Sequence, residues 1–140
     1  MAQKTYRDLL TFRQYAGSWL ASHKEPSKFR YGVKKIFDAT KTLHEQYDEQ
    51  LQDLSIEHCT EKDGVIATNA GGGFQFSKEN LRKRNAATKE LSKKLVDVPS
   101  YMAKEPPKDL SDDEREAFAG FVLPDLADEE PTEDAMEQAG

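Results

Sequence analysis

A long stripe of residues at helical spacing, between positions 28 and 58, constrains the fold more than any other feature of this sequence. Its members recur at steps of 3, 4, 3, 4 and 7 residues: Val33, Ile36, Thr40, Leu43, Tyr47 and Leu54. Such steps return to one face of an α-helix, and a near-heptad repeat lets one helix pack along another. We therefore predict a single long helix over residues 28–58, with Ser27 as its N-cap, that pairs with a second helix.

The predicted partner is a helix over residues 78–96. Ser77 is a suitable N-cap, and Glu79 falls in the first turn, where the helix dipole favours a negative charge. Leu81, Thr88, Leu91 and Leu95 follow at spacings of 7, 3 and 4 residues. Pro99 ends the helical pattern, because proline lacks the amide hydrogen that a helix requires. The two segments together favour an antiparallel helical hairpin.

The connection between these helices contains three consecutive glycines, Gly71 to Gly73. A phosphate-binding loop needs glycines that open directly into a helix, and a P-loop also ends in Gly-Lys-Ser/Thr. Here Phe74–Phe76 intervene, and they alternate apolar and polar residues as a half-buried strand does. The turn signal "KDG" and the β-branched stretch 65–68 precede them. We therefore predict a small β-hairpin over residues 64–76 at the tip of the helical hairpin.

The two ends of the chain add further elements. Apolar residues at helical spacing predict an extra N-terminal helix over residues 5–22, which completes a helical domain over residues 1–98. Residues 99–110 are interrupted by proline and are expected to be a linker. The motif "SDDE" at 111–114 matches a capping box and predicts a short helix over 111–123. Residues 124–140 are acidic and poor in large apolar side chains, so we expect a disordered acidic C-terminal tail. The predicted fold class is mainly α.

Charge is distributed unevenly along the chain. Residues 1–100 hold 17 Lys and Arg against 13 Asp and Glu, whereas residues 101–140 hold 3 against 13. The candidate partner-binding residues form a basic cluster, Lys78, Arg82, Lys83, Arg84, Lys89, Lys93 and Lys94, and an acidic-tail set, Asp125, Asp128, Glu129, Glu130, Glu133 and Asp134. A further basic group at 28–35 would lie near 93–94 if the helices pack antiparallel. A basic stripe can follow a phosphate backbone, although a solvated lysine-rich helix is the plainer interpretation.

The sequence contains no recognisable catalytic or metal-binding motif. Cys59 is the single cysteine, the histidines show no HxxxH spacing, and no GxSxG is present. Acids along 45–53 lack the Glu-x-x-His motifs of di-iron bundles, so a solvated helix face is the better interpretation. We therefore expect no enzymatic activity, no metal and no cofactor. No apolar run is long enough for a membrane span, and the N-terminus lacks a secretory signal, which favours the cytoplasm.

Two stretches carry a resemblance to a known group of proteins. "SKFRYGVKKIFDATKTLHEQYDEQL" opens a long helix with basic residues, and "FQFSKENLRKRNAATKELSKKL" joins an aromatic strand to a "KEN" helix start. With the "KDG" turn between them, this pattern resembles small uncharacterised bacteriophage accessory proteins over about residues 28–98. The resemblance implies a phage origin and a non-enzymatic accessory role, and it brings no catalytic residues.

The leading functional hypothesis is therefore a phage accessory protein that binds a partner protein, either a virion component or a host factor. The contact would use helical surfaces or the acidic tail, in the host cytoplasm or in the virion. The alternative is a nucleic-acid-binding protein that uses the basic helix 78–94 and is autoinhibited by the tail. A small hydrolase or metal enzyme is the third hypothesis. The long helix exceeds its partner in length, so a homo-oligomer is a further way to cover its apolar stripe.

Overall fold

The computed structural model describes residues 2–124 and divides them into two compact units. Unit 1 contains residues 2–41 and 95–124, and unit 2 contains residues 42–94. The fold is mainly helical, as predicted, with small two-stranded antiparallel sheets. This division differs from the expected domain over residues 1–98, because the chain leaves unit 1 after Lys41 and re-enters it at Leu95.

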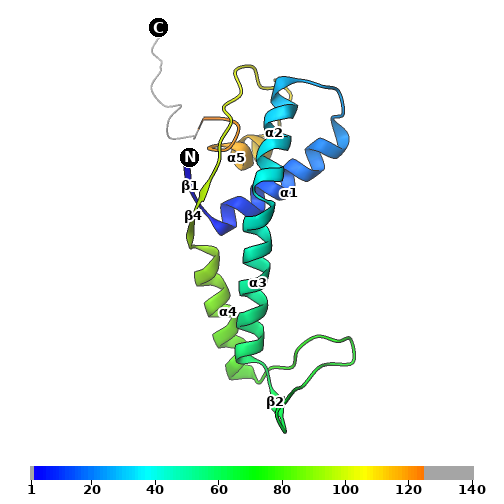
Figure 1. Ribbon diagram of the computed structural model, residues 1–140, viewed down its shortest axis with the longest axis vertical. Coiled ribbons are helices and arrows are strands. Elements are labelled where there is room, and N and C mark those ends of the chain that lie inside the picture. Colours follow the sequence, from blue (N-terminus) through cyan, green and yellow to red (C-terminus); the bar gives the residue numbers. More distant parts are fainter. Residues whose placement is uncertain (1, 125–140) are drawn as a thin grey trace. The chain divides into compact units, whose positions relative to one another are not determined.

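Unit 1 is built from both ends of the described chain (Figure 1). Its elements are β1 (Ala2–Thr5), α1 (Tyr6–Ser22), α2 (Lys28–Ala39), β4 (Leu95–Val98) and α5 (Asp112–Phe118). Strand β1 pairs antiparallel with β4. The N-caps Thr5, Ser27 and Ser111 each accept a hydrogen bond from a backbone amide three residues later, which satisfies a donor that the first turn leaves free.

The core of unit 1 is aromatic. The ring of Phe12 stacks on Phe121 at 4.4 Å and meets Phe118 edge-on at 5.7 Å, and Trp19 meets Phe29 edge-on at 5.2 Å. The buried apolar residues of this unit are Tyr6, Leu9, Phe12, Ala16, Trp19, Phe29, Val33, Ile36, Val98, Leu110, Ala117, Phe118, Ala119, Phe121, Val122 and Leu123. The expected N-terminal helix thus buries its predicted stripe against α2 and α5.

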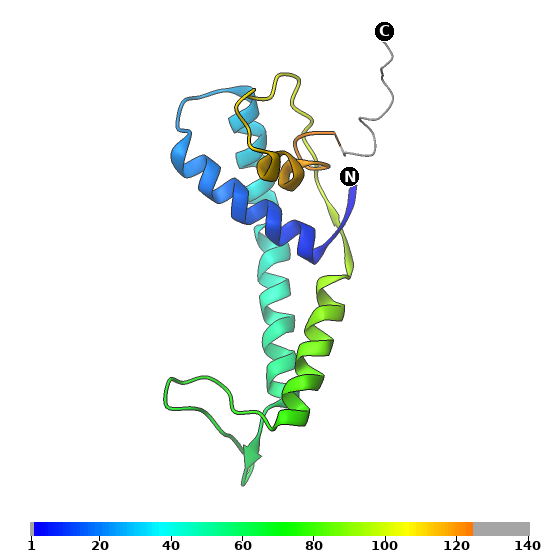
Figure 2. The same ribbon diagram turned by 180° about the vertical axis from the view of Figure 1, so that it is seen from behind.

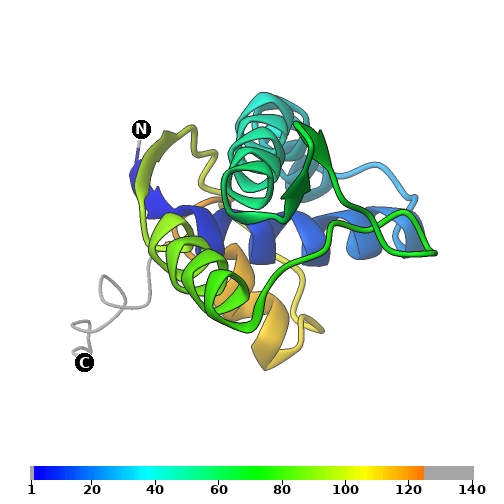
Figure 3. The same cartoon turned by 90° about the horizontal axis from the view of Figure 1, so that it is seen from below.

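Unit 2 contains α3 (Lys41–His58), β2 (Glu61–Lys62), β3 (Val65–Ile66) and α4 (Lys78–Ser92), with Lys41 assigned to unit 1. Figures 1 and 2 show α3 and α4 side by side and running in opposite directions, and Figure 3 shows them from below. Arg84 Nε on α4 donates to Ser55 Oγ on α3 at 3.2 Å. Tyr47 is the buried apolar residue of this unit, so the helical pair has little core of its own among the described residues.

The single helix predicted over residues 28–58 is wrong in one respect, because α2 ends at Ala39 and α3 begins at Lys41. Thr40, between them, is completely buried and donates its hydroxyl to the carbonyl of Ile36 at 2.8 Å. Arg13 Nη1 donates to Thr40 Oγ1 at 2.9 Å and to the carbonyl of Phe37. That carbonyl is the one that the amide of Lys41 would use in a continuous helix. The Arg13 side chain from α1 therefore competes with the Lys41 amide for an acceptor that helix continuation would use.

The pairing of strands between α3 and α4 also differs from the expected hairpin over 64–76. Strands β2 and β3 pair around Asp63 and Gly64, whose φ angles are 54° and 77°. The "KDG" signal thus forms the turn between strands instead of preceding them. The segments expected to be strands meet at an isolated bridge between Thr68 and Phe74, and Asn69 N donates to Gly73 O at 2.7 Å within the glycine turn.

The C-terminal part of the described chain departs from the sequence prediction in three places. Helix α4 ends at Ser92 instead of residue 96, and Leu95 and Val96, expected to be helical, belong to β4 because β1 offers a partner strand. Segment 99–110 is more than a linker, since Tyr101 N donates to Phe121 O at 2.8 Å and Ala103 N to Val122 O at 3.0 Å. Helix α5 has the predicted capping box but ends at Phe118, before Gly120 at φ 82°.

Candidate binding surfaces

Helix α4 carries most of the predicted basic cluster on its exposed side. At 3.6 residues per turn, four of its members lie within about 60° of one another around the helix axis. We call these four the α4 basic face: Lys78, Arg82, Lys89 and Lys93. All four are exposed, and the half-buried residues Asn80, Ala87 and Leu91 lie on the opposite side of the helix. The sequence therefore places a row of cations where solvent and partners can reach it.

The α4 basic face is long and little neutralised. Lys93 comes fifteen positions after Lys78, which corresponds to about 22 Å of helix. The two acids of this region pair within their own turns, Glu79 with Lys83 at 3.6 Å and Glu90 with Lys93 at 3.9 Å. Within residues 2–124, Lys78, Arg82 and Lys89 form no ion pair, so their charges are available to an anionic ligand. Lys94 is also exposed, one residue beyond the row.

Arg84 differs from the rest of the predicted cluster. Its Nε donates to the buried Ser55 hydroxyl, its Nη1 donates to Asn85 Oδ1, and its guanidinium lies 6.0 Å from the centre of the Phe76 ring. These contacts tie α4 to α3 and to the chain before α4. Arg84 is therefore a packing residue of unit 2 in this structure.

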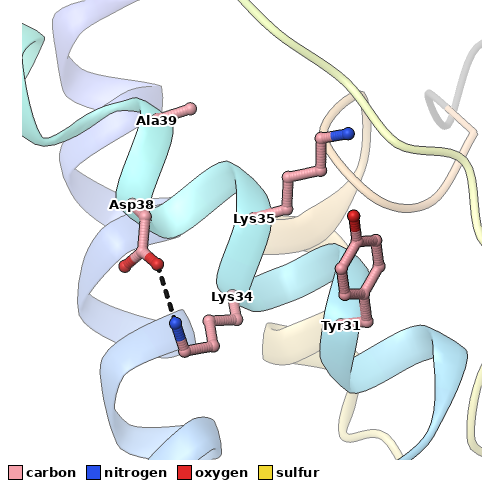
Figure 4. Close-up of a pocket in the computed structure, with 5 residues that line it drawn as sticks. All are labelled: Tyr31, Lys34, Lys35, Asp38 and Ala39. Carbon is pink, nitrogen blue, oxygen red and sulfur yellow. Dashed lines mark hydrogen bonds and ion pairs between the residues drawn. The ribbon is translucent and has the colours of Figure 1, made fainter.

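A second basic surface lies on α2 in unit 1. Tyr31, Lys34, Lys35, Asp38 and Ala39 line an open hollow of about 490 Å³. Figure 4 shows Lys34 and Asp38 turned toward each other, joined by an ion pair of 2.9 Å, with Tyr31 and Lys35 on the other side of the α2 ribbon. Lys35 Nζ lies 5.8 Å from the centre of the Tyr31 ring. This surface thus combines an exposed aromatic ring with a cation that no acid among residues 2–124 neutralises.

A cleft of about 570 Å³ lies at the start of α2, where residues 27–29 face residues 101–105. Tyr101 lines it and meets Tyr31 edge-on at 5.6 Å, so the two rings connect the cleft with the α2 hollow. Sequence reasoning missed this cleft because residues 99–110 were expected to be a linker. The sequence did contain a sign of this packing, since Tyr101 and Met102 are two large side chains beside a proline-rich stretch.

Helix α3 contrasts with α4 in charge. Its acids Glu45, Asp48, Glu49, Asp53 and Glu57 are exposed, as the prediction of a solvated face implies. His44 Nε2 lies 3.5 Å from Asp48 on the same helix. Within residues 2–124, no group of three or more His, Cys, Asp or Glu side chains could hold a metal ion.

The predicted acidic-tail residues, from Asp125 to Asp134, lie outside the described part of the chain, as does the predicted disorder of 124–140 apart from Pro124. The expected contact between the tail and the basic cluster therefore stays a prediction from the sequence. The basic group at 28–35 belongs to unit 1 and the cluster on α4 belongs to unit 2, so the expected closeness of 28–35 to 93–94 stays a prediction. Over residues 2–124, no helix has the length and apolar character of a membrane span.

No protein-family model, curated protein or solved structure matches this chain. The resemblance to phage accessory proteins therefore stays a prediction from the sequence.

Proposed function

We propose that this protein is a non-enzymatic binding protein and that the α4 basic face binds a nucleic-acid backbone. The observation that supports this proposal is the row of Lys78, Arg82, Lys89 and Lys93 along one exposed side of α4. Phosphates attract such a row without regard to base sequence, and the release of condensed counterions drives the association. The proposed binding is therefore electrostatic and independent of nucleotide sequence.

The composition of this face fits a phosphate backbone better than a protein surface. Protein–protein interfaces are enriched in aromatic residues, methionine and arginine and are depleted in lysine. The α4 basic face has three lysines and one arginine, and Asn85 and Ala86 lie between them. With four phosphate contacts, log K for duplex DNA should fall with log salt concentration at a slope of roughly −3 to −4.

The test is fluorescence anisotropy of a labelled DNA duplex with the full chain between 50 and 200 mM salt. We expect the Lys78→Glu, Arg82→Glu, Lys89→Glu variant to lose at least about tenfold in affinity at low salt, since three attractions become repulsions. The matched control is Lys24→Glu, Lys62→Glu, Lys108→Glu, which reverses three exposed lysines elsewhere and gives the same net charge. Equal losses in both variants, or no binding by the original chain, would overturn the proposal.

A second candidate function is docking on a partner protein, the leading hypothesis from the sequence. Three apolar side chains of unit 2 are exposed, Ile56 by 43%, Val65 by 67% and Leu81 by 41%. A partner that covers them would add apolar burial to a unit with little core. Affinity capture should then retain one protein on the original chain and on the charge-reversed α4 variant, and lose it on Ile56→Ser, Val65→Ser, Leu81→Ser. Retention by this last variant would contradict the candidate.

A further inference from the structure

The cleft at the start of α2 is lined by four apolar residues and by exposed charged ones, which we call its rim. Its apolar lining residues are Phe29, Tyr101, Met102 and Ala103, and its polar ones are Ser27, Lys28, Lys104 and Glu105. Met102 is 47% exposed, so it presents apolar surface to solvent in the wall of the cleft. An occupant that places an apolar side chain there would remove this surface from water.

The walls of the cleft are held in place by contacts inside unit 1. The segment 101–103 is fixed by the hydrogen bonds from Tyr101 and Ala103 to the carbonyls of Phe121 and Val122. Tyr101 also packs directly on Gly32 of α2, where an added Cβ atom would lie 2.5 Å from its ring. The cleft is therefore formed before any occupant arrives.

The charges around the cleft favour an acidic occupant. Helix α2 carries Lys28, Arg30, Lys34 and Lys35 and a single acid. That acid, Asp38, already pairs with Lys34. The rim carries two cations, Lys28 and Lys104, and one acid, Glu105. A segment with several carboxylates and one or two apolar side chains would complement both the rim and the apolar lining residues.

We propose that residues 125–140 of this same chain occupy the cleft. This segment contains seven Asp and Glu and no Lys, Arg or His, and it includes Leu126 and Met136 as apolar side chains. It follows Pro124, two residues after Val122, whose carbonyl accepts from the cleft wall. Sixteen residues span up to about 55 Å when extended, so the segment is long enough to reach the cleft.

This contact lies within unit 1 and differs from the autoinhibition expected from the sequence, in which the tail covers the basic helix 78–94. It does not depend on the proposed nucleic-acid binding, which uses α4 in unit 2. The two ideas can therefore fail separately.

The test is photo-crosslinking in the full chain with benzoylphenylalanine placed at one position at a time, in place of Met102 in the cleft or of Asn85 on α4. Mass spectrometry of the crosslinked monomer should identify residues 125–140 as the partner of position 102. Crosslinks from position 102 to another segment, crosslinks between two copies, or no crosslink would each overturn the proposal. Crosslinking of residues 125–140 from position 85 alone would overturn it in favour of autoinhibition.

Charge reversal checks that the rim lysines recognise the segment. The variant Lys28→Glu, Lys104→Glu should reduce the crosslinking yield from position 102 at least about fivefold, because like charges then face the acidic segment. The control variant Lys24→Glu, Lys108→Glu changes the net charge equally at exposed positions that do not line the cleft. Adding Asp128→Lys, Glu129→Lys to the rim variant should restore the yield. Equal loss in both lysine variants would contradict the proposed contact.

Discussion

Arg13 shows how one side chain can decide where a helix ends. Its guanidinium lies 4.2 Å from the centre of the Phe37 ring and donates to the Phe37 carbonyl and to the Thr40 hydroxyl. In the sequence, Arg13 lies among polar residues of an amphipathic helix and gives no sign of this role. Thr40 likewise fits the stripe of the long predicted helix. Only the approach of α1 to α2 makes residue 40 the end of a helix.

Gly32 is a second position at which local preference and packing oppose each other. Alanine is favoured over glycine inside a helix by about 1 kcal/mol. At Gly32, however, an added Cβ atom would lie 2.5 Å from Cδ1 of Tyr101. Because Tyr101 is held by its backbone bond to Phe121, relieving this overlap must shift packed atoms. Overpacking of this kind costs about 1 to 3 kcal/mol.

We therefore predict that Gly32→Ala lowers the free energy of unfolding by about 1 kcal/mol net, despite its better helix propensity. Gly17→Ala is the matched control, because the nearest atom to its added Cβ is Phe37 Cε1 at an ordinary 3.6 Å. That variant should be stabilised by about 0.5 to 1 kcal/mol. Urea denaturation followed by circular dichroism gives both values, and stabilisation by Gly32→Ala would refute the overlap.

At the scale of elements, α5 is a short helix whose start is fixed by its own sequence. Ser111 Oγ accepts from Glu114 N at 3.1 Å, and Glu114 Oε1 accepts from Ser111 N at 2.8 Å. This capping box is the one predicted from "SDDE". The capping box stabilises a helix of seven residues, which would be only marginally stable in isolation. That helix carries Phe118, whose side chain is completely buried in the core.

Loss of the cap should therefore weaken unit 1. We predict that Ser111→Ala lowers the free energy of unfolding by about 1 kcal/mol, since the amide of Glu114 loses the Ser111 hydroxyl as its acceptor. Ser100→Ala, at an exposed position of the same unit, should change it by less than about 0.5 kcal/mol. Thermal unfolding by calorimetry can compare the two variants, and equal effects would mean that the capping box adds no stability.

At the scale of the whole molecule, burial is concentrated in one of the two units. Unit 1 holds the aromatic core, whereas Tyr47 and Ser55 are the buried residues of unit 2 within the described chain. Helix α4 has no buried residue. Stability against local opening follows the amount of buried apolar contact, so the two units should open at different free energies.

We predict that amide hydrogens of α3 and α4 exchange with solvent faster than those of α1, by at least about tenfold in protection factor. Hydrogen–deuterium exchange with mass spectrometry at low protein concentration measures this difference. Equal protection would contradict the prediction. If equality appeared only on raising the protein concentration, a second copy would be covering unit 2.

The sequence by itself determined the mainly helical fold and the points at which α2, α4 and α5 begin. Ser27, Ser77 and Ser111 were predicted as caps, and each accepts the expected amide hydrogen bond, because a cap depends only on residues within one turn. The basic row on α4 was readable for the same reason, since helical spacing alone places its members on one side.

Tertiary structure alone decided the break at Thr40, the strand at 95–98 and the cleft beside residues 101–105. Each depends on a partner far away in the chain: Arg13 for Thr40, Thr5 for Leu95, and Phe121 for Tyr101. Residues 95 and 96 fit the pattern of the helix predicted over 78–96, and they belong to a strand because β1 supplies their hydrogen-bond partners. The spacing of apolar residues along the chain predicts which face of an element is apolar, but it does not predict which distant segment will lie beside that element.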